Sequence, residues 1–475
     1  MGRKKQTIDA GSSLDIHNFS RQLLHLIDQN HYVFIIFLII FLFSSFHISL
    51  DMKPGLSAQA QIEYVKSHGG DDSLYYALAE NIVNGTGYFD TYRHAEIMPS
   101  VGHPLLLAIL CVVLGLPPTT FTWFLLLSSV VLLALAARIY TRSNICVVCT
   151  MLLYGSFFRY IQWFTVNAEC SVAFGGSLLI FALACLYKSD FRAPWPVIAG
   201  AALAMHILIR PLYLFPTHIC SLIVLAVVLY HYIRKRNVPL NNFIKGWFIA
   251  LAATQGILLS VYCYSHLAYN DSRLITGTYG AWPLYTANSI HIPPEGRYLT
   301  KRHYQHSKEF TELHKLVGQK DSGMSWQERH KLLMRKVTSY WKSHPKRALR
   351  GWWWRFRQFT AIHPGLAFLG HPFRRMHTLS VSALLMLILI RVISACIYAK
   401  QKIWSIIKSP GLLVAGLFFL YSAIHALFVY AGFRHVTPTF TLLVAAITFL
   451  LFETRKLCIK IALSITRLTK KLCLE

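Results

Sequence analysis

The sequence predicts an all-α protein that crosses a membrane about ten times, and three observations predict this class. Apolar residues make up 55% of the 475-residue chain and charged residues only 14%, whereas charged residues are about 25% of ordinary soluble domains. Lys and Arg outnumber Asp and Glu by 47 to 20, which gives a formal net charge of +27. The third observation is a series of apolar runs, each close to the roughly 20 residues that a helix needs to cross the hydrocarbon.

Ten apolar runs are predicted to span the membrane as helices, because lipid offers no hydrogen-bond partner to an irregular backbone. They are residues 32–50, 119–137, 144–163, 172–187, 196–214, 217–232, 243–265, 378–398, 410–432 and 436–452. No small-residue cleavage site closely follows the first run, so we expect a retained span. A further run from Pro104 to Leu116 is short, which is typical of an interfacial or re-entrant segment.

Basic residues between the runs predict the orientation, since Lys and Arg collect in cytoplasmic loops. If residues 104–116 do not span and the N-terminus is cytoplasmic, every main basic cluster between the spans faces the cytoplasm. These clusters lie at 138–142, 188–192, 234–236, 400–402 and 455–456. If residues 104–116 spanned, all of these clusters would move outside. We therefore expect both termini in the cytoplasm.

This topology divides the chain into segments with different expected roles. Residues 1–31 form a cytoplasmic N-terminal segment, and 32–265 form a first transmembrane module that contains an outer loop over 51–118. A second outer loop covers 266–377. The segments that follow it are the C-terminal spans, 378–453, and a cytoplasmic tail, 454–475.

The first outer loop contains a predicted helix from Ser73 to Val83 with acidic residues at its start. The apolar positions at helical spacing are Leu74, Ala77, Leu78 and Ile82. We expect this amphipathic helix to lie on the membrane surface. Asp71 and Asp72 stand where an N-cap belongs, so one of them could simply cap the helix. Gly85 and Gly87 predict its end.

This loop resembles the first outer loop of the GT-C superfamily of membrane glycosyltransferases. The branch in question includes protein O-mannosyltransferase-like, aminoarabinose-transferase-like and rhizobial lipopolysaccharide glycosyltransferase-like enzymes. Their loop runs Asp-x-x-x-Tyr-x-x-x-Ala-x-x-Leu/Ile-x-x-Gly-x-Gly, and a Pro-rich entry to an apolar surface helix follows. The residues that fit are Asp71, Tyr75, Ala79, Ile82, Gly85, Gly87 and Pro104. Asp72 stands where such enzymes often have a second acidic residue, and His103 stands where a Pro is frequent.

The resemblance continues downstream and covers roughly residues 30 to 455. Glu169 opens the fourth span, where these enzymes often place an acidic residue on the outer face. Arg210 lies in Leu-Ile-Arg-Pro, which resembles their Leu-Thr-Arg-Pro at the end of an outward span. Residues 276–288 resemble the Gly-rich start of their second large loop. Arg434 and His435 resemble an Arg-Tyr-x-x-Pro motif, with His in place of the commoner Tyr.

The resemblance implies a GT-C-type helical bundle that moves a sugar from a polyprenyl-phosphate donor to a hydroxyl acceptor. A sugar hydroxyl attacks better when a carboxylate accepts its proton, and Arg stabilises a leaving lipid phosphate. Asp71 is then the general base with Asp72 as its alternate, Glu169 assists the base or positions the acceptor, and Arg210 and Arg434 hold the phosphate. The other substrate-binding candidates are Tyr75, His103 and His435. The structural alternatives are an ion pair for Glu169 and an interfacial anchor for Arg210.

Cofactors and partners follow from the same segments. His68, His94, Glu96 and His103 match no tight metal-binding spacing, so no metal ligand is assigned and a divalent cation is left open as a cofactor. The expected partners are the polyprenyl-phosphate sugar, a lipid or glycan acceptor, and membrane lipids. Nucleic acid is excluded because the basic second loop faces outward. We expect the protein in the bacterial inner membrane, with its active site on the periplasmic side.

The second outer loop is basic and aromatic, especially from Trp326 to Phe359, where only Pro345 and Gly351 interrupt a helical pattern. Trp and Arg side chains favour the lipid headgroup layer. The pattern predicts a surface-lying scaffold helix, and a sharper hypothesis is that this segment guides anionic lipid carriers or a lipopolysaccharide-like acceptor.

Two other functions remain open. One is an O-antigen ligase or polymerase, which would use a diphosphate-linked glycan and need not have the acidic first loop. The other is a non-enzymatic lipid or solute transporter or flippase, which would place ionisable groups near the middle of the membrane. The central candidates for that role are His206 and His425, and helix packing is the alternative for both.

Overall fold

The computed structural model describes residues 57–67, 71–88, 99–161, 168–234, 241–270, 272–276, 284–285, 287–288, 326–360, 372–397, 409–428 and 439–472. Within these residues the chain is almost entirely helical and contains no strand. The helices of the bundle are α6 (Pro118–Thr141), α7 (Asn144–Ile161), α8 (Ala168–Lys188), α9 (Trp195–Ile209), α10 (Leu214–Arg234), α11 (Asn242–Tyr269), α18 (Pro372–Ile397), α20 (Pro410–Phe428) and α22 (Thr439–Leu472).

Five described helices are long and apolar enough to cross a membrane. They are Pro118–Thr141, Ala168–Lys188, Pro211–Arg234, Asn242–Tyr269 and Pro410–Leu427. The prediction of an all-α protein is therefore confirmed for the described residues, and these helices indicate an integral membrane protein. The described parts of the predicted spans other than 32–50 lie mostly in helices, but α9 ends at Ile209, before the end of the predicted span 196–214. Residues 32–50 lie outside the described residues, and the number of ten spans stays a prediction.

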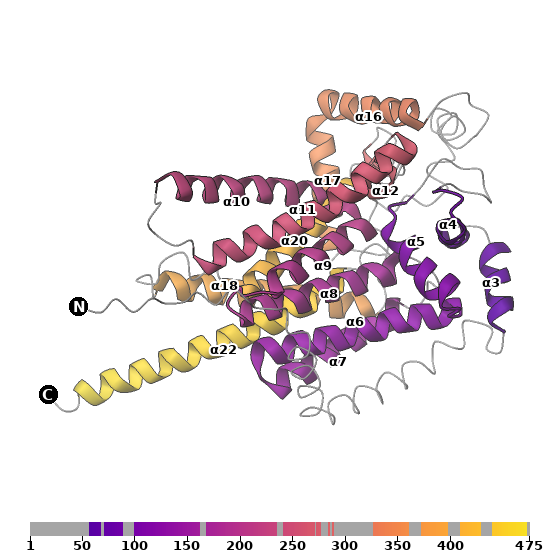
Figure 1. The fold of residues 1–475 in the computed structure, drawn as a ribbon. Helices are drawn as coiled ribbons and strands as arrows, with labels where there is room; N and C mark the ends of the chain where they lie inside the picture. Colours follow the sequence, from indigo (N-terminus) through magenta and orange to yellow (C-terminus); the bar gives the residue numbers. More distant parts are fainter. Residues whose placement is uncertain are drawn as a thin grey trace, which may run out of the picture.

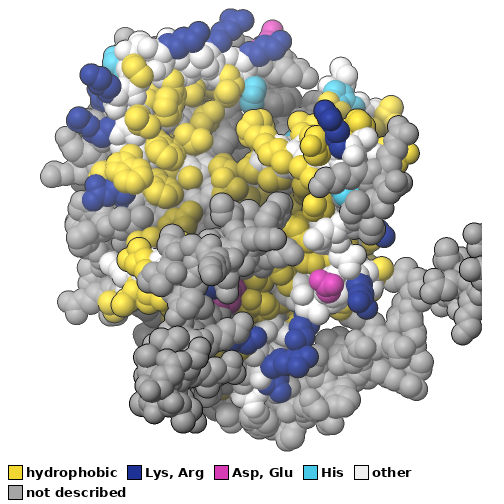
Figure 2. Space-filling view, turned by 90° about the vertical axis from the view of Figure 1, so that its left-hand side faces the viewer, with side chains coloured by type: hydrophobic (Ala, Val, Ile, Leu, Met, Phe, Trp, Pro, Cys, Tyr) yellow, Lys and Arg dark blue, Asp and Glu magenta, His cyan; other side chains and the backbone are white. Residues whose placement is uncertain are grey.

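Helix α8 lies at the centre of the bundle, and α10 lies at its edge (Figure 1). In their most apolar stretches 83% of α8 is buried, against 11% of α10. Small residues on α8 let its neighbours approach, as is usual between membrane helices. A Cβ on Gly175 would come within 3.1 Å of Nδ1 of His206 on α9. The exposed side chains of α10 are mostly apolar, including Phe215, Leu222 and Ile233, and Figure 2 shows broad hydrophobic areas between groups of Lys and Arg.

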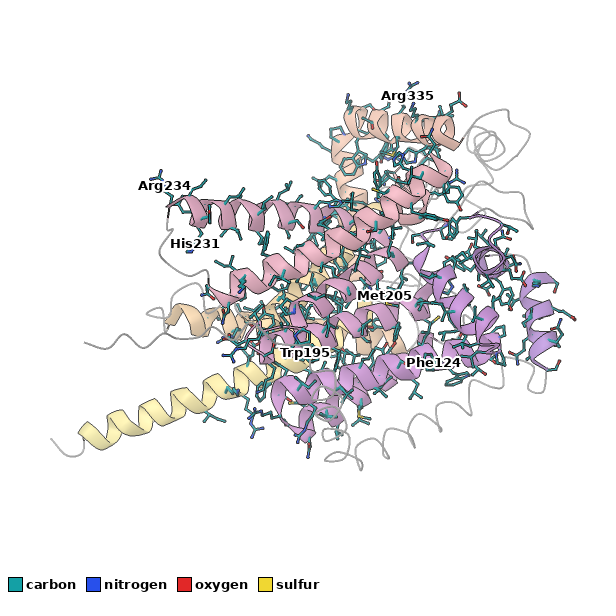
Figure 3. All side chains as sticks on the ribbon, in the orientation of Figure 1. Phe124, Trp195, Met205, His231, Arg234 and Arg335 are labelled. Carbon is teal, nitrogen blue, oxygen red and sulfur yellow. The ribbon has the colours of Figure 1, made fainter. Side chains whose placement is uncertain are left out.

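The bundle has two ends with different polar residues. Helices α8 and α9 run antiparallel and are joined by residues 189–194, so the start of α8 lies beside the end of α9 (Figure 1). We call this the Glu169 end. The opposite end, where Glu453 of α22 meets the start of α20, is the Glu453 end. In Figure 3 Arg234, the last residue of α10, lies on the side of the Glu453 end.

Short helices of the predicted first loop cover the Glu169 end (Figure 1). They are α3 (Ala58–Ser67), α4 (Asp71–Asn84), α5 (Gly102–Leu107) and the π-helix η1 (Ala108–Val113). Helices α5 and η1 have six residues each and follow one another directly. At 1.5 Å per residue they reach about 18 Å, short of the roughly 30 Å of a hydrocarbon core. Their length fits the interfacial or re-entrant segment that the sequence predicts.

The predicted helical segment from Trp326 to Phe359 forms two helices, α16 (Trp326–Ser343) and α17 (Pro345–Phe359). The break falls at Pro345, which starts α17 because proline fits a first helical position. Gly351 does not interrupt the helix. Helix α16 lies at the edge of the molecule, and Arg335 points away from the bundle (Figure 3).

Helix α17 is fixed to the end of α20 by buried polar contacts. Nε of Arg355 donates to the carbonyl of Ala426 at 2.6 Å, and its Nη2 donates to Oδ1 of Asn288 at 3.1 Å. The amide of Asn288 donates to the carbonyl of Leu427 at 2.6 Å. The last carbonyls of a helix have no partner within it, and a cation is favourable there. These contacts therefore hold the part of α20 that reaches the Glu169 end.

Candidate functional site

Helix α4 places the acidic pair of the first loop at a defined helix start. Asp71 and Asp72 occupy its first turn, where a carboxylate is stabilised by the helix dipole. The helix ends as expected at Gly85, whose φ of +67° favours glycine. The backbone N–H of Thr86 donates to the carbonyl of Asn81 at 3.1 Å, which closes the turn. The predicted helix is confirmed, although α4 buries residues on several faces rather than one, and its position on the membrane surface stays a prediction.

Tyr75 and His103 connect α4 to the centre of the bundle. Tyr75 lies one helical turn after Asp71, so the two side chains share a face of α4. Its ring meets that of His103 on α5 edge to face, with centroids 4.5 Å apart. His103 is 1% exposed, and its Nδ1 is 2.7 Å from Oγ of Ser171 on α8. These contacts join the predicted catalytic loop to the first turns of α8.

The start of α5 lies directly on the end of α9. A Cβ on Gly102 would lie 2.5 Å from the backbone nitrogen of Ile209 and from the carbonyl carbon of Leu208. Only glycine permits this approach. Beside it, Oγ of Ser100 donates to the carbonyl of Ile209 at 2.9 Å. Arg210 follows immediately, so the same contact fixes its backbone against the first loop.

Glu169 and Arg210 form an ion pair at this end of the bundle. Nη2 of Arg210 lies 3.4 Å from Oε1 of Glu169, whose side chain is 4% exposed, while that of Arg210 is 20% exposed. The helix dipoles favour both charges, because Glu169 is in the first turn of α8 and Arg210 is the C-cap of α9. The contact is longer than a good hydrogen bond. Oε2 of Glu169 and Nη1 of Arg210 have no hydrogen-bond partner, and such buried atoms cost about 1–3 kcal/mol each.

Aromatic and histidine side chains from α9, from the short 3-10 helix η2 (Pro211–Tyr213) and from α20 continue the site inward. The Tyr421 hydroxyl lies close to the Arg210 guanidinium. Its ring is 5.6 Å from that of Tyr213 and 5.4 Å from that of His425, and 6.5 Å from that of His206. The sequence indicates helix packing or transport for His206 and His425, and Tyr421 is not among the residues predicted from it. A helix-face signal was present, because Tyr421 and His425 lie one turn apart on α20.

A buried tyrosine supports the loop that follows α4. Tyr88 is 2% exposed, and its hydroxyl donates to the carbonyl of Pro99 at 2.9 Å. Burial, with smaller contributions from Tyr75 and Tyr269, raises its pKa well above the usual value. The hydroxyl therefore stays a neutral donor at physiological pH. It holds the two ends of the segment between α4 and α5 together.

The structure brings together four of the residues singled out from the sequence: Tyr75, His103, Glu169 and Arg210. Asp71 and Asp72 start the helix that carries Tyr75. Arg434 and His435 lie outside the described residues.

Of the residues considered for a metal, His68, His94 and Glu96 also lie outside them. No group of three or more His, Cys, Asp or Glu side chains suited to a metal occurs in the described ranges.

No family model, curated protein or solved structure matches this chain.

Proposed function

We propose that the chain is a GT-C-type membrane glycosyltransferase that moves a sugar from a polyprenyl-phosphate donor to a hydroxyl acceptor. One observation carries the proposal. Residues chosen from separate sequence segments, Tyr75, Glu169 and Arg210, lie at one end of the bundle, with an acidic helix start and an Arg that retains an unpaired nitrogen. Proton acceptance by a carboxylate and charge stabilisation by Arg are the two contributions that such a transfer needs.

The proposed arrangement gives each group one task. Asp71 accepts the proton of the acceptor hydroxyl, and Asp72 is its alternate. Arg210 binds the lipid phosphate as it leaves with the electrons of the sugar–oxygen bond. Glu169 orients Arg210 and accepts a hydrogen bond from a hydroxyl of the sugar or acceptor. A carboxylate beside the guanidinium keeps Arg210 in place before the donor binds, as preorganised electrostatic stabilisation requires.

The proposed topology places this chemistry on the non-cytoplasmic face. The Glu169 end carries the acidic helix α4, whereas Arg142, Lys188 and Arg192 lie at or near helix ends on the opposite side. Lys and Arg favour the cytoplasmic side. We therefore infer ten spans, with the Glu169 end in the periplasm of a bacterial inner membrane and a lipid or glycan as acceptor.

A transporter is the second candidate, and the buried polar groups at the Glu169 end favour it. Ionisable side chains inside a membrane bundle mark transport paths as well as catalytic sites. The two functions differ in what they need from α4, because a transporter would not require a proton acceptor at Asp71.

The test is replacement of Asp71 by Asn in the full-length protein. We expect Asp71→Asn to insert and accumulate normally but to lose sugar transfer by about 10²- to 10⁴-fold, the usual contribution of a general base. The readout is mass spectrometry of cell-envelope glycans in cells with the wild type, the variant or no protein.

Glu80→Gln on the same helix is the matched control. Glu80 pairs with Lys66 at 2.6 Å, and both side chains are partly exposed. Such surface pairs contribute at most about 1 kcal/mol, so this variant should keep full transfer. Normal transfer by Asp71→Asn, or equal loss in both variants, would remove Asp71 from the mechanism.

A further inference from the structure

Buried polar atoms without hydrogen-bond partners are concentrated behind the Glu169–Arg210 pair. In the described part of the chain they include Oε2 of Glu169, both ring nitrogens of His206, Nη1 of Arg210 and the hydroxyl oxygen of Tyr421. They come from α8, α9 with its C-cap, and α20. Most buried polar groups in native proteins are paired. Such a group of unpaired atoms therefore needs a physical explanation.

Packing alone does not explain the hydroxyl of Tyr421. Tyr213 provides a direct comparison, because the two rings are 5.6 Å apart and both side chains are buried. The hydroxyl of Tyr213 donates to the carbonyl of Leu417 at 2.9 Å, so its burial is satisfied. The hydroxyl of Tyr421 donates to no acceptor, and its charged neighbour, the Arg210 guanidinium, can itself only donate. Phenylalanine would fill the same volume without burying an unpaired oxygen.

The unpaired atoms are mostly hydrogen-bond donors, so a ligand that satisfies them must supply acceptor atoms. Nη1 of Arg210 can only donate, the Tyr421 hydroxyl can donate, and a neutral His206 has one N–H to donate. The unpaired acceptor-only atom among them is Oε2 of Glu169. A ligand with an anionic oxygen and a nearby hydroxyl would satisfy both kinds of atom. Its anionic oxygen would accept from the donors, and its hydroxyl would donate to Oε2 of Glu169. A sugar phosphate has this composition.

We propose that Tyr421 and Arg210 together bind the oxyanion of a phosphate group, with α20 supplying the second donor. This inference rests on the proposed function and adds to it a binding residue from the C-terminal half of the chain. A phosphate can reach this site from the surface at Arg210, because the side chain of Arg210 is 20% exposed. The hydroxyl of Tyr421 already lies close to the guanidinium, so a phosphate that contacts Nη1 also comes within its reach.

The experiment measures ligand binding to the purified full-length protein in lipid nanodiscs. The probes are a polyprenyl phosphate, the corresponding polyprenol without phosphate, and inorganic phosphate. We expect the wild type to prefer polyprenyl phosphate over polyprenol, and Tyr421→Phe to bind it roughly tenfold more weakly or worse, as for a hydrogen bond to a charged group. Arg210→Lys tests the same contact from the other side and should also weaken binding, because Lys lacks the planar fork.

Tyr213→Phe is the matched control, since it removes one oxygen from the neighbouring ring. It should leave affinity for polyprenyl phosphate within about twofold while lowering thermal stability, because a buried carbonyl loses its donor. Equal affinity of Tyr421→Phe and the wild type would overturn the proposal, as would equal binding of polyprenyl phosphate and polyprenol. Tyr421-dependent binding of inorganic phosphate alone would support the anion site but contradict the lipid carrier.

Binding and transfer fail separately, so the two proposals are distinguishable. If the wild type binds polyprenyl phosphate through Tyr421 but transfers no sugar, the binding site stands and the proposed function falls. If sugar transfer occurs and Tyr421→Phe transfers and binds normally, the proposed function stands and the role of Tyr421 falls.

Discussion

Two carboxylates, the buried Glu169 and the half-buried Glu453, lie at opposite ends of the bundle, and each is paired with an arginine. Glu453 accepts hydrogen bonds from Tyr140 at 2.8 Å, from the backbone N–H of Gly411 at 2.9 Å and from Ser409, and it pairs with Arg391 at 3.6 Å. Both of its oxygens are used. Glu169 uses one oxygen, in a 3.4 Å contact with Arg210, and the other has no partner.

The two ends differ in how completely the carboxylate is hydrogen-bonded, and this difference separates a structural charge from a functional one. Glu453 joins α6, α18, α20 and α22, and its partners satisfy the start of α20 together with Ser409, which caps it. A fully bonded carboxylate is stable where it is. The unpaired atoms around Glu169 carry a cost that a ligand would remove. Sequence alone could not distinguish these cases, because both residues are single acids near the end of an apolar run.

The largest expected effect on stability is at Glu453. Glu453→Ala leaves the charge of Arg391 without its carboxylate and leaves several donors unpaired, so we expect it to lower the free energy of unfolding by about 3–5 kcal/mol. Glu169→Ala removes a carboxylate with a single 3.4 Å contact and should cost about 1–3 kcal/mol. Thermal unfolding of the two purified variants in one detergent measures the comparison. A larger loss for Glu169→Ala would contradict the structural role of Glu453.

Much of the fold could be predicted from local sequence signals. The apolar runs predicted the helices and Gly85 predicted the end of α4, whereas one helix was expected from Trp326 to Phe359 and the structure divides it at Pro345. These signals act over a few residues, through hydrogen bonding in lipid and backbone sterics.

The internal part of the site could not be predicted, because it depends on contacts between distant helices. Tyr421 meets Arg210 only because α20 packs against η2, which follows α9, and α17 holds the end of α20. An ion pair with an unspecified Arg was the structural alternative for Glu169, and the structure pairs it with Arg210. The roles of both residues in catalysis stay predictions.

An intermediate effect is expected from close backbone packing at the Glu169 end. Gly102→Ala would place a Cβ 2.5 Å from the backbone of Ile209 and must separate α5 from α9. We expect a loss of about 1–3 kcal/mol in stability and a greater loss of transfer than stability alone explains, because Arg210 shifts.

The matched control for this effect is Gly200→Ala. Its Cβ would lie 2.2 Å from the carbonyl oxygen of Ala250 on α11, and it lies in the middle of α9 rather than at its end. It should cost similar stability but keep the transfer rate per folded molecule. Unfolding midpoints and transfer rates of both variants give the comparison, and equal rates per folded molecule would show that the α5–α9 contact does not position the site.

The smallest expected effect concerns the turn after α4. Gly85 has φ of +67° and no atom within 4 Å of an added Cβ, so only its backbone conformation is at stake. Gly85→Ala should therefore lower stability by about 1 kcal/mol and leave transfer nearly unchanged. Thermal unfolding and the glycan assay check both parts. A large loss of transfer would mean that the turn itself contacts a substrate.

The most direct test of the account is sugar transfer by Glu169→Gln and Glu453→Gln, each expressed per amount of folded protein. The account predicts that Glu169→Gln loses roughly 10²-fold or more of the transfer, as for removal of a preorganised electrostatic contact. Glu453→Gln should retain most of its transfer, because its carboxylate only joins helices. Equal transfer by the two variants, or selective loss in Glu453→Gln, would contradict the assignment of the Glu169 end as the reactive one.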